Sequence, residues 1–332
     1  MQTIQDYTSR QGAQPLVTFI ITYYNQPVPM LCECINSILA LSLSASEREI
    51  IVIDDGSEVS PMNGLIQYGE DIIYVRQKNS GVSVARNTGL RMARGQFIQI
   101  VDGDDYLLQT PYEHCLDIIR YRQDADIVLF DFTHSNVSDK SFKTPQTYSG
   151  TEFMLKNNLK GAVWCCIFRN SVRGNLQFTP GIKYGEDEEF TPQLILRADV
   201  VYDTKCQAYH YRQHISSAVH QKDEDSRQNR LNDTLTVIRS LNTKADRLPN
   251  NDKLAMRRRV AQLTMDYLYN TIILTHSRQE LEKRIKELYA EGLFPLPDRD
   301  YSQKYKWFRK MINTSLGRSI LLNTLPLLGK ER

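Results

Sequence analysis

Residues 97–105 read FIQIVDGDD, an apolar run that ends in three carboxylates within four residues. In an α/β fold, ligands bind at the carboxyl edge of the sheet, which is where Asp102, Asp104 and Asp105 would lie. Carboxylates crowded in this way repel one another unless a cation lies between them. Because hard oxygen atoms are the ligands that Mg²⁺ and Mn²⁺ prefer, the stretch predicts a divalent-metal site that holds a phosphorylated substrate. The alternative is a polar turn after a strand, which an isolated Asp-Gly-Asp would favour.

The rest of the amino-terminal half alternates between strand patterns and helix patterns. Short apolar, β-branched runs typical of buried parallel strands occupy residues 16–22, 49–53, 72–75, 97–101 and 126–132. Apolar residues at helical spacing lie between these runs, near residues 31–39, 82–94 and 111–122. The alternation predicts an α/β fold with a doubly wound, mostly parallel sheet flanked by helices, whose site lies at the carboxyl ends of the strands.

The pattern becomes helical throughout beyond residue 222. We therefore expect an N-terminal tail over 1–14, an α/β domain over 15–221 and a helical C-terminal region over 222–332. Residues 1–14 are polar and lack the apolar core of a signal peptide, and no run reaches the roughly 18–20 apolar residues of a membrane span. These features predict a cytoplasmic protein whose only contact with a membrane is peripheral.

The composition is that of an ordinary soluble globular protein, with 332 residues, of which 41% are hydrophobic and 24% charged. The formal net charge of +2 gives no reason to expect nucleic-acid binding. The six cysteines include no Cys-x-x-Cys pair, which predicts reduced thiols and argues against a zinc site or a disulfide scaffold.

Polar side chains follow the first two predicted strands, at positions suited to a nucleotide. Thr22, Tyr24 and Asn25 follow one strand, and Asp55 follows the next. An aromatic ring can stack on a base while a carboxylate accepts its N–H, so these residues are candidates for a nucleotide pocket. Ordinary turn chemistry at the ends of strands explains them equally well.

A helix that starts with small residues follows the third strand. Gly81 opens the helix, and Arg86 and Asn87 lie one turn in, which resembles a phosphate-binding helix start. For Ala85 and Gly89, close packing against the sheet is the better explanation.

An acidic run over residues 185–189 begins another predicted helix, far in sequence from the aspartate cluster. A carboxylate that takes a proton from an attacking hydroxyl would suit Asp187, provided that the fold brings it near the cluster. The alternative is an acidic first turn that interacts favourably with the helix dipole, which accounts for Glu188 and Glu189.

Three further side chains are candidates for contact with the metal or a diphosphate. His210 and His220 could add nitrogen ligands to the metal, and Arg212 could contact the diphosphate. Surface histidines without such a role are commoner. Trp164 either packs in the core or stacks on the face of a sugar.

The stretch over residues 301–328 interleaves basic residues with aromatic and aliphatic ones. This pattern is typical of a basic amphipathic helix that lies on an anionic bilayer. The alternative is that its apolar side chains pack on the preceding helices.

Five segments together resemble family 2 glycosyltransferases, the inverting class with the GT-A fold. They occur in the family's order at residues 17–25, 51–57, 79–89, 102–105 and 185–187. The resemblance extends from about Pro15 to Tyr211 and implies a GT-A domain in an enzyme of the kind that builds bacterial surface polysaccharides.

The resemblance implies roles for individual residues. The donor nucleotide-sugar would contact Thr22, Tyr24, Asn25, Asp55, Lys78, Gly81, Arg86, Asn87, Asp102 and Arg212. A divalent cation, Mn²⁺ or Mg²⁺, would be held by Asp104 and Asp102, with Asp105, His210 and His220 as further candidates. Asp187 matches the family's base, and Trp164 and Glu186 would contact the acceptor.

The implied reaction moves a sugar from a nucleotide-diphosphate donor, most commonly a uridine one, to a hydroxyl of a lipid-linked or growing surface glycan. A single displacement inverts the anomeric centre. One departure concerns the acceptor side, since Cys165 and Cys166 follow Trp164 where relatives often carry Asn-Lys. The alternative function is a non-catalytic nucleotide-sugar-binding or assembly subunit of a polysaccharide synthesis complex. A dinucleotide-dependent oxidoreductase has less support, because no Gly-x-Gly-x-x-Gly follows the first strand.

Overall fold

The computed structural model describes residues 14–135, 142–213 and 224–328. His220 and most of the predicted N-terminal tail lie outside these residues. The chain divides into two compact units, the first made of Met1–Tyr148, Ala162–Gly181 and Arg197–Gln213, and the second of Ser149–Gly161, Ile182–Leu196 and His214–Arg332.

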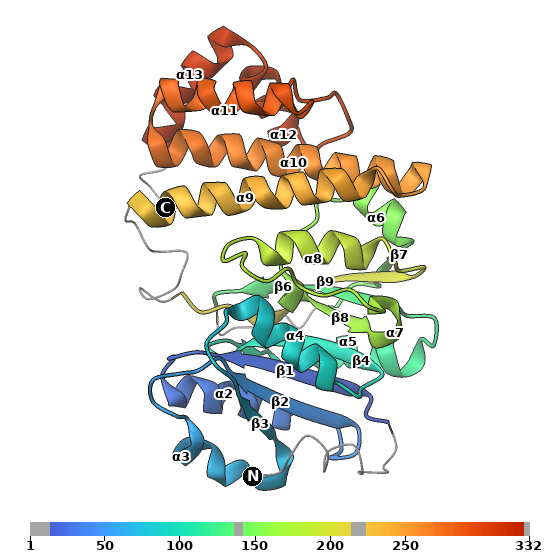
Figure 1. Ribbon diagram of the computed structural model, residues 1–332. Coiled ribbons are helices and arrows are strands. Elements are labelled where there is room, and N and C mark those ends of the chain that lie inside the picture. Colours follow the sequence, from blue (N-terminus) through green and yellow to red (C-terminus); the bar gives the residue numbers. More distant parts are fainter. Residues whose placement is uncertain (1–13, 136–141, 214–223, 329–332) are drawn as a thin grey trace. The chain divides into compact units, whose positions relative to one another are not determined.

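The first unit contains a mixed sheet (Figure 1). In the described residues its strands are β1 (Val17–Tyr23), β2 (Arg48–Asp54), β3 (Ile73–Arg76), β4 (Phe97–Asp102), β5 (Tyr106–Leu107), β6 (Ile127–Thr133), β7 (Gln146–Tyr148), β8 (Cys166–Arg169) and β9 (Val201–His210). Their order is β3-β2-β1-β4-β8-β6-β9-β5, and β7 pairs with β9. The pairs among β3, β2, β1 and β4 are parallel, as the sequence predicts.

The remaining strands make the sheet less parallel than expected. β8 is antiparallel to both β4 and β6, and β9 is antiparallel to β5 and β7. β9 is the longest strand of the sheet in the described residues and also pairs in parallel with β6. The α/β class is confirmed, with a mixed sheet in place of a mostly parallel one.

Helices of the first unit are α2 (Val28–Leu39), α3 (Met62–Leu65), η1 (Ile66–Asp71), α4 (Val82–Met92), α5 (Gln109–Tyr121), η2 (Val163–Cys165) and α7 (Asn170–Arg173). The small residues of α4 have the packing role that the sequence predicts. Ala85 packs in a cluster with Ile51 and Ile53 of β2. A Cβ on Gly89 would lie 2.2 Å from the Ile20 side chain of β1, so only glycine lets α4 approach the sheet this closely.

The second unit is helical. Its elements are α6 (Gly150–Lys156), α8 (Glu186–Ile195), α9 (Glu224–Ala245), α10 (Asn250–Thr275), α11 (Arg278–Ala290), α12 (Gln303–Ile312) and α13 (Ser315–Leu328). Helices α9 and α10 lie side by side (Figure 1). A continuous core joins these helices through buried residues such as Leu235, Tyr267, Leu281 and Phe308. Helices α6 and α8 belong to this unit, although the sequence division placed them in the α/β domain. Within the described residues, none of the helices combines the length and hydropathy that a membrane span requires.

One carboxylate in the core of the helical unit carries a stability consequence. The hydroxyl of Tyr305 donates to both carboxylate oxygens of Asp266, at 2.9 and 2.8 Å. Burial raises the pKa of Asp266 to about 6, because the charged form loses its hydration. Between pH 4 and pH 6 the folded chain therefore keeps a proton that the unfolded chain has lost, and the free energy of unfolding falls as the pH rises.

We predict that Asp266→Asn removes this fall in the free energy of unfolding with rising pH, because asparagine can still accept from Tyr305 but does not ionise. Relative to wild type, the free energy of unfolding of the variant should improve by about 3 kcal/mol between pH 4 and pH 7. Urea denaturation followed by circular dichroism at several pH values measures the difference. Parallel pH profiles for the two proteins would contradict the prediction.

Candidate functional site

Parallel register brings the ends of three strands together at one edge of the sheet. Thr22 of β1 lies opposite Ile53 of β2 on one side and Asp102 of β4 on the other. The Thr22 hydroxyl donates to Asp102 Oδ1 at 3.3 Å. The carboxyl edge predicted from the sequence is therefore formed by the segments that carry the candidate residues.

Arg86 fixes the first carboxylate of the cluster. Its guanidinium donates to Asp102 Oδ1 at 3.1 Å and lies over the Phe178 ring, 5.3 Å from the centroid. Arg86 is buried, so its charge is poorly screened and the ion pair holds Asp102 in one orientation. Within the protein, Arg86 thus contacts a member of the aspartate cluster, Asp102.

Asp105 joins two strands and is not exposed at the site. Its Oδ2 accepts from the Tyr209 hydroxyl and its Oδ1 accepts from the backbone N–H of Arg212, both at 2.8 Å. Burial, together with the charges of Asp102 and Asp104, raises the pKa of Asp105 to about 8. Asp105 was a candidate metal ligand, but its oxygens tie the end of β9 to the aspartate cluster.

A metal ion fits the cluster only with oxygen atoms from a further ligand. Among the described residues, no three histidine, cysteine, aspartate or glutamate side chains lie close enough together to hold a metal ion. Asp102 and Asp104 remain as two half-buried carboxylates. Mg²⁺ in phosphate-transferring sites is commonly held by one or two carboxylates plus substrate phosphates, and this pair has the chemistry for that arrangement.

His210 and Arg212 both lie against Tyr106. The His210 ring stacks on Tyr106 with centroids 4.3 Å apart, and the Arg212 guanidinium lies 4.9 Å from the Tyr106 centroid and pairs with Glu33. Neither ring nitrogen of His210 has a hydrogen-bond partner within the described part of the chain. Burial and the charge of Arg212 lower the pKa of His210, which favours the neutral imidazole.

The loops that follow β1 and β2 are joined to each other. Asn25 has a φ of 56°, its N–H donates to Ser57 Oγ at 3.0 Å, and its Oδ1 accepts from the Glu58 N–H at 2.8 Å. Tyr24 beside it is 45% exposed, which leaves its ring accessible to a flat ligand. Asn25 therefore shapes the loop, while Tyr24 is presented to solvent.

Asp55 organises the loop that leads into α4. Its carboxylate accepts from Gln77 Nε2 at 2.7 Å, from the Ser80 N–H at 3.0 Å and from the Gly81 N–H at 2.8 Å. Lys78 lies in this loop with an exposed side chain. By holding the backbone of this loop, Asp55 thus determines where Lys78 lies.

Asn87 has a structural role that the sequence did not indicate. Its amide nitrogen donates to the Phe178 carbonyl at 2.8 Å, and its Oδ1 accepts from the Phe178 N–H at 2.9 Å. Both ends of this buried amide are therefore engaged by the backbone of a segment 91 residues away. Asn87 thus holds Phe178, whose ring lies beside the Arg86 guanidinium.

Trp164 belongs to an aromatic cluster. Its ring stacks with Tyr209 at 4.5 Å and with Tyr211 at 5.5 Å between centroids, and Phe132 meets it edge-on at 5.2 Å. Trp164 is half-buried. It therefore packs against other aromatic rings and still has an exposed part that a sugar could contact. The spacing of Tyr209, near the end of β9, and Tyr211, just after it, was the available sequence signal for this cluster.

Asp187 and Glu186 belong to the second unit, whereas the aspartate cluster belongs to the first. Asp187 lies in the first turn of α8, is mostly buried, and follows Gly185, which has a φ of 87°. The first turn of α8 is acidic as expected, and two of its carboxylates pair with cations: Glu188 with Arg259 and Glu189 with Lys244.

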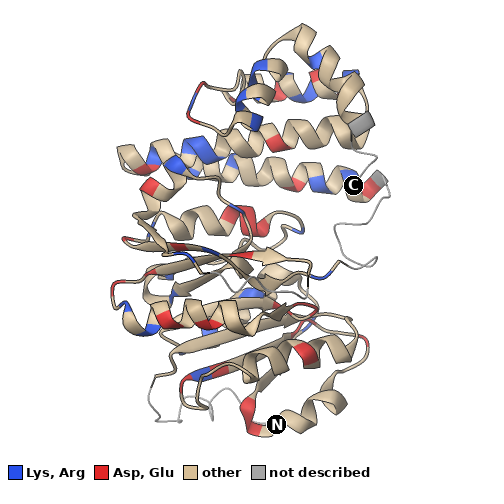
Figure 2. Cartoon of the chain, turned by 180° about the vertical axis from the view of Figure 1, so that it is seen from behind, with Lys and Arg blue, Asp and Glu red and all other residues tan. Residues whose placement is uncertain are grey.

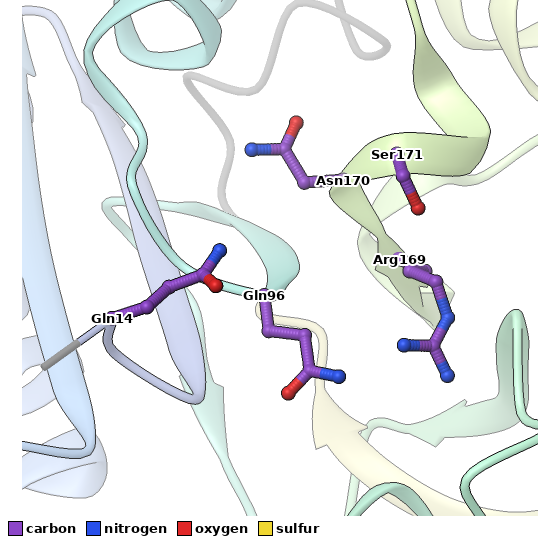
Figure 3. Close-up of a pocket in the computed structure, with 5 residues that line it drawn as sticks. All are labelled: Gln14, Gln96, Arg169, Asn170 and Ser171. Atoms are coloured by element: carbon purple, nitrogen blue, oxygen red, sulfur yellow. The ribbon is translucent and has the colours of Figure 1, made fainter.

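A hollow in the first unit lies away from these residues. It is lined by Gln14, Gln96, Arg169, Asn170 and Ser171 (Figure 3). Gln96 precedes β4 and Arg169 ends the antiparallel β8, so the hollow lies at the edge of the sheet opposite the aspartates. The Arg169 guanidinium donates to the backbone carbonyls of Gln123 and Ala125.

A mixed sheet with paired carboxylates at the end of a central parallel strand defines a domain of the GT-A type. Residues 18–174 match the family model described as "Glycosyl transferase family 2". This part of the chain belongs to that family, which confirms the resemblance seen in the sequence.

Curated relatives include the uncharacterized glycosyltransferase EpsJ of Bacillus subtilis, 31% identical over 61% of this chain and 62% of the relative. The minor teichoic acid biosynthesis protein GgaB of the same organism is 26% identical over 58% of this chain and 22% of its own length. The chain thus spans less than two thirds of the length of either relative.

Solved structures share the fold. TarS 1–349 of Staphylococcus aureus in complex with UDP-GlcNAc has a TM-score of 0.63 at 18% identity, covering 95% of this chain and 91% of that one. The mannosyltransferase PcManGT from Pyrobaculum calidifontis, in complex with GDP-Man and Mn²⁺, has a TM-score of 0.55 at 13% identity, covering 98% and 93%.

We predict that Asn87→Ala lowers the free energy of unfolding by about 2–4 kcal/mol, because it leaves the buried N–H and C=O of Phe178 unpaired. The exposed Asn79, replaced by alanine, is the matched control and should change stability by less than about 0.5 kcal/mol. Urea denaturation of both variants measures this. Equal, small effects would show that Asn87 does not hold the Phe178 segment.

Proposed function

We propose that the chain is an inverting glycosyltransferase that moves a sugar from a nucleotide-diphosphate donor to an acceptor hydroxyl. The observation that carries the proposal is the half-buried pair Asp102 and Asp104 at the end of β4, inside a family 2 domain. The Arg86 contact that orients Asp102 supports it, because a merely polar turn needs no buried guanidinium.

The donor we propose is a UDP-sugar. TarS binds UDP and UDP-GlcNAc in its structures, whereas PcManGT binds GDP-Man, so the base is the first property to test. In this proposal Tyr24 stacks on the base, while Thr22, Asn25 and Asp55 shape its pocket. Lys78, Arg86 and Arg212 supply positive charge for the diphosphate, and Gly81 lets the backbone pass close to it.

A divalent cation, Mn²⁺ or Mg²⁺, would be held by Asp104 and Asp102 together with phosphate oxygens of the donor. When bound, it would neutralise negative charge on the departing nucleoside diphosphate. His210 remains a further candidate ligand.

Asp187 is the proposed base. It would take the proton from the acceptor hydroxyl while that oxygen attacks the anomeric carbon from the face opposite the leaving group, which inverts the centre in one step. The proposal requires the second unit to bring Asp187 to the acceptor oxygen. Trp164 and Glu186 would contact an acceptor that is a lipid-linked or growing surface glycan, which is consistent with the teichoic acid relative.

We expect UDP with Mn²⁺ to raise the melting temperature of the wild-type protein, because a ligand that binds only the folded state stabilises it by about 2.7 kcal/mol at 100 times its dissociation constant. Asp104→Ala should abolish the metal-dependent shift. Asp187→Asn should keep the shift but lose transfer from UDP-GlcNAc. Differential scanning fluorimetry with a panel of nucleoside diphosphates and a UDP-release assay measure both.

The outcomes separate the candidate functions. No shift with any nucleotide would contradict donor binding. A different result would favour the non-catalytic assembly subunit. In that case UDP with Mn²⁺ would raise the melting temperatures of the wild type and of Asp187→Asn equally, and neither protein would release UDP from UDP-GlcNAc.

The proposed location is the surface of a membrane, contacted through residues 301–328. Phe308, Ile312, Leu321 and Leu325 of this stretch pack in the core of the helical unit. Three further apolar residues of the stretch, Trp307, Leu316 and Ile320, are 51%, 75% and 41% exposed. The stretch has five basic residues and no acidic one, which favours an anionic bilayer over other partners.

Replacing Trp307, Leu316 and Ile320 together by glutamine should lower binding to phosphatidylserine vesicles by about tenfold or more, because three apolar side chains no longer enter the interface. The matched control replaces Val59, Met62 and Ile66, which are equally exposed elsewhere, by glutamine. Co-sedimentation measures both. Equal binding of the two triple variants would contradict this location.

A further inference from the structure

The acidic start of α8 is held by two neighbouring helices of its own unit. Glu188 forms an ion pair with Arg259 of α10. Glu189 Oε1 accepts from Lys244 Nζ at 2.6 Å and from Ser240 Oγ at 2.5 Å, both on α9. Figure 2 colours the acidic and basic residues of the whole chain, those of α8, α9 and α10 among them. The helix dipole favours carboxylates in this turn, and the two cations offset part of the repulsion among them.

The backbone just before α8 is also fixed. Asp233 Oδ2, on α9, accepts from the N–H groups of Lys183 and Tyr184, at 2.9 and 3.0 Å. Gly185 then turns the chain through a left-handed conformation into α8. Asp233 therefore anchors the chain two residues upstream of Glu186.

The Glu188 side chain lies beside the loop after α6, where a Cβ on Gly161 would meet its carboxylate. The Glu188 side chain is 34% exposed, whereas its partner Arg259 is buried. The ion pair therefore restrains Glu188 from the side of α10.

We infer that Asp233, Lys244 and Arg259 are positioning residues for Asp187. They tie the chain before Asp187 and the two residues after it, so the backbone of Asp187 is fixed within a single turn. This inference rests on the proposed role of Asp187 as the base. A base must lie within hydrogen-bond reach of the proton that it takes, and a displacement of about 1 Å can cost on the order of a hundredfold in rate.

The key variant is the charge-balanced pair Glu188→Gln with Arg259→Met. It removes the tether without leaving a buried charge unpaired, so the melting temperature should stay near that of wild type. We expect faster hydrogen exchange in residues 183–189. Turnover of UDP-GlcNAc, measured as UDP release with Mn²⁺, should fall about tenfold or more in kcat while the donor KM changes less than twofold.

Two controls accompany this variant. Arg259→Lys keeps the cation and should retain most of kcat. Arg257→Met, on the same helix but paired with Asp246, should leave both exchange and turnover unchanged. Unchanged exchange in residues 183–189 of the charge-balanced variant would overturn the inference, as would a wild-type kcat.

Asp187→Asn distinguishes this failure from failure of the proposed function. If Asp187→Asn abolishes turnover and the charge-balanced variant does not lower it, only the positioning role fails. If Asp187→Asn leaves turnover intact, the base assignment fails and the positioning role fails with it.

Discussion

Repulsion among the three carboxylates that end β4 is the constraint on which the site depends. The fold answers it differently for each one. Asp102 receives a buried guanidinium from α4, and Asp105 is buried and bonded to β9, with a pKa raised to about 8 that favours its neutral form at pH 7. Asp102 and Asp104 then remain as the half-buried pair of the cluster. The same contacts that separate the charges also fix α4 and β9 against the end of β4.

The register of the parallel strands places other candidate residues beside the aspartates. Parallel pairing places Thr22 beside Asp102, and the buried Asp54 at the end of β2 accepts from the Ser57 N–H at 2.8 Å and the Tyr74 hydroxyl at 2.7 Å. These bonds hold the loops after β1 and β2, so few groups need to move when a ligand arrives. A slip of one residue would turn every alternate side chain away from this edge, which makes the apolar strand pattern a determinant of the chemistry.

The amino-terminal strands and the position of the aspartates were predictable because both depend on local pattern: apolar runs set the strands, and parallel strands share one carboxyl edge. The antiparallel pairings of β8 with β4 and β6, and of β9 with β5 and β7, were not, since pairing between distant segments leaves no local signal. The same holds for Asn87 and Asp105, whose partners Phe178, Tyr209 and Arg212 lie 91 to 107 residues away. Residue type indicated polarity at these positions, and only the fold shows which polar groups are engaged by the protein.

The candidate residues are divided between the part of the chain that matches the family and the helical region that follows it. The family match ends at residue 174, before α8, so the candidate donor loops lie in the matched part and Asp187 lies beyond it. An acidic helix start cannot be buried without cations, and α8 takes them from α9 and α10. Lys244 and Arg259 thus hold the two residues that follow Asp187 against α9 and α10.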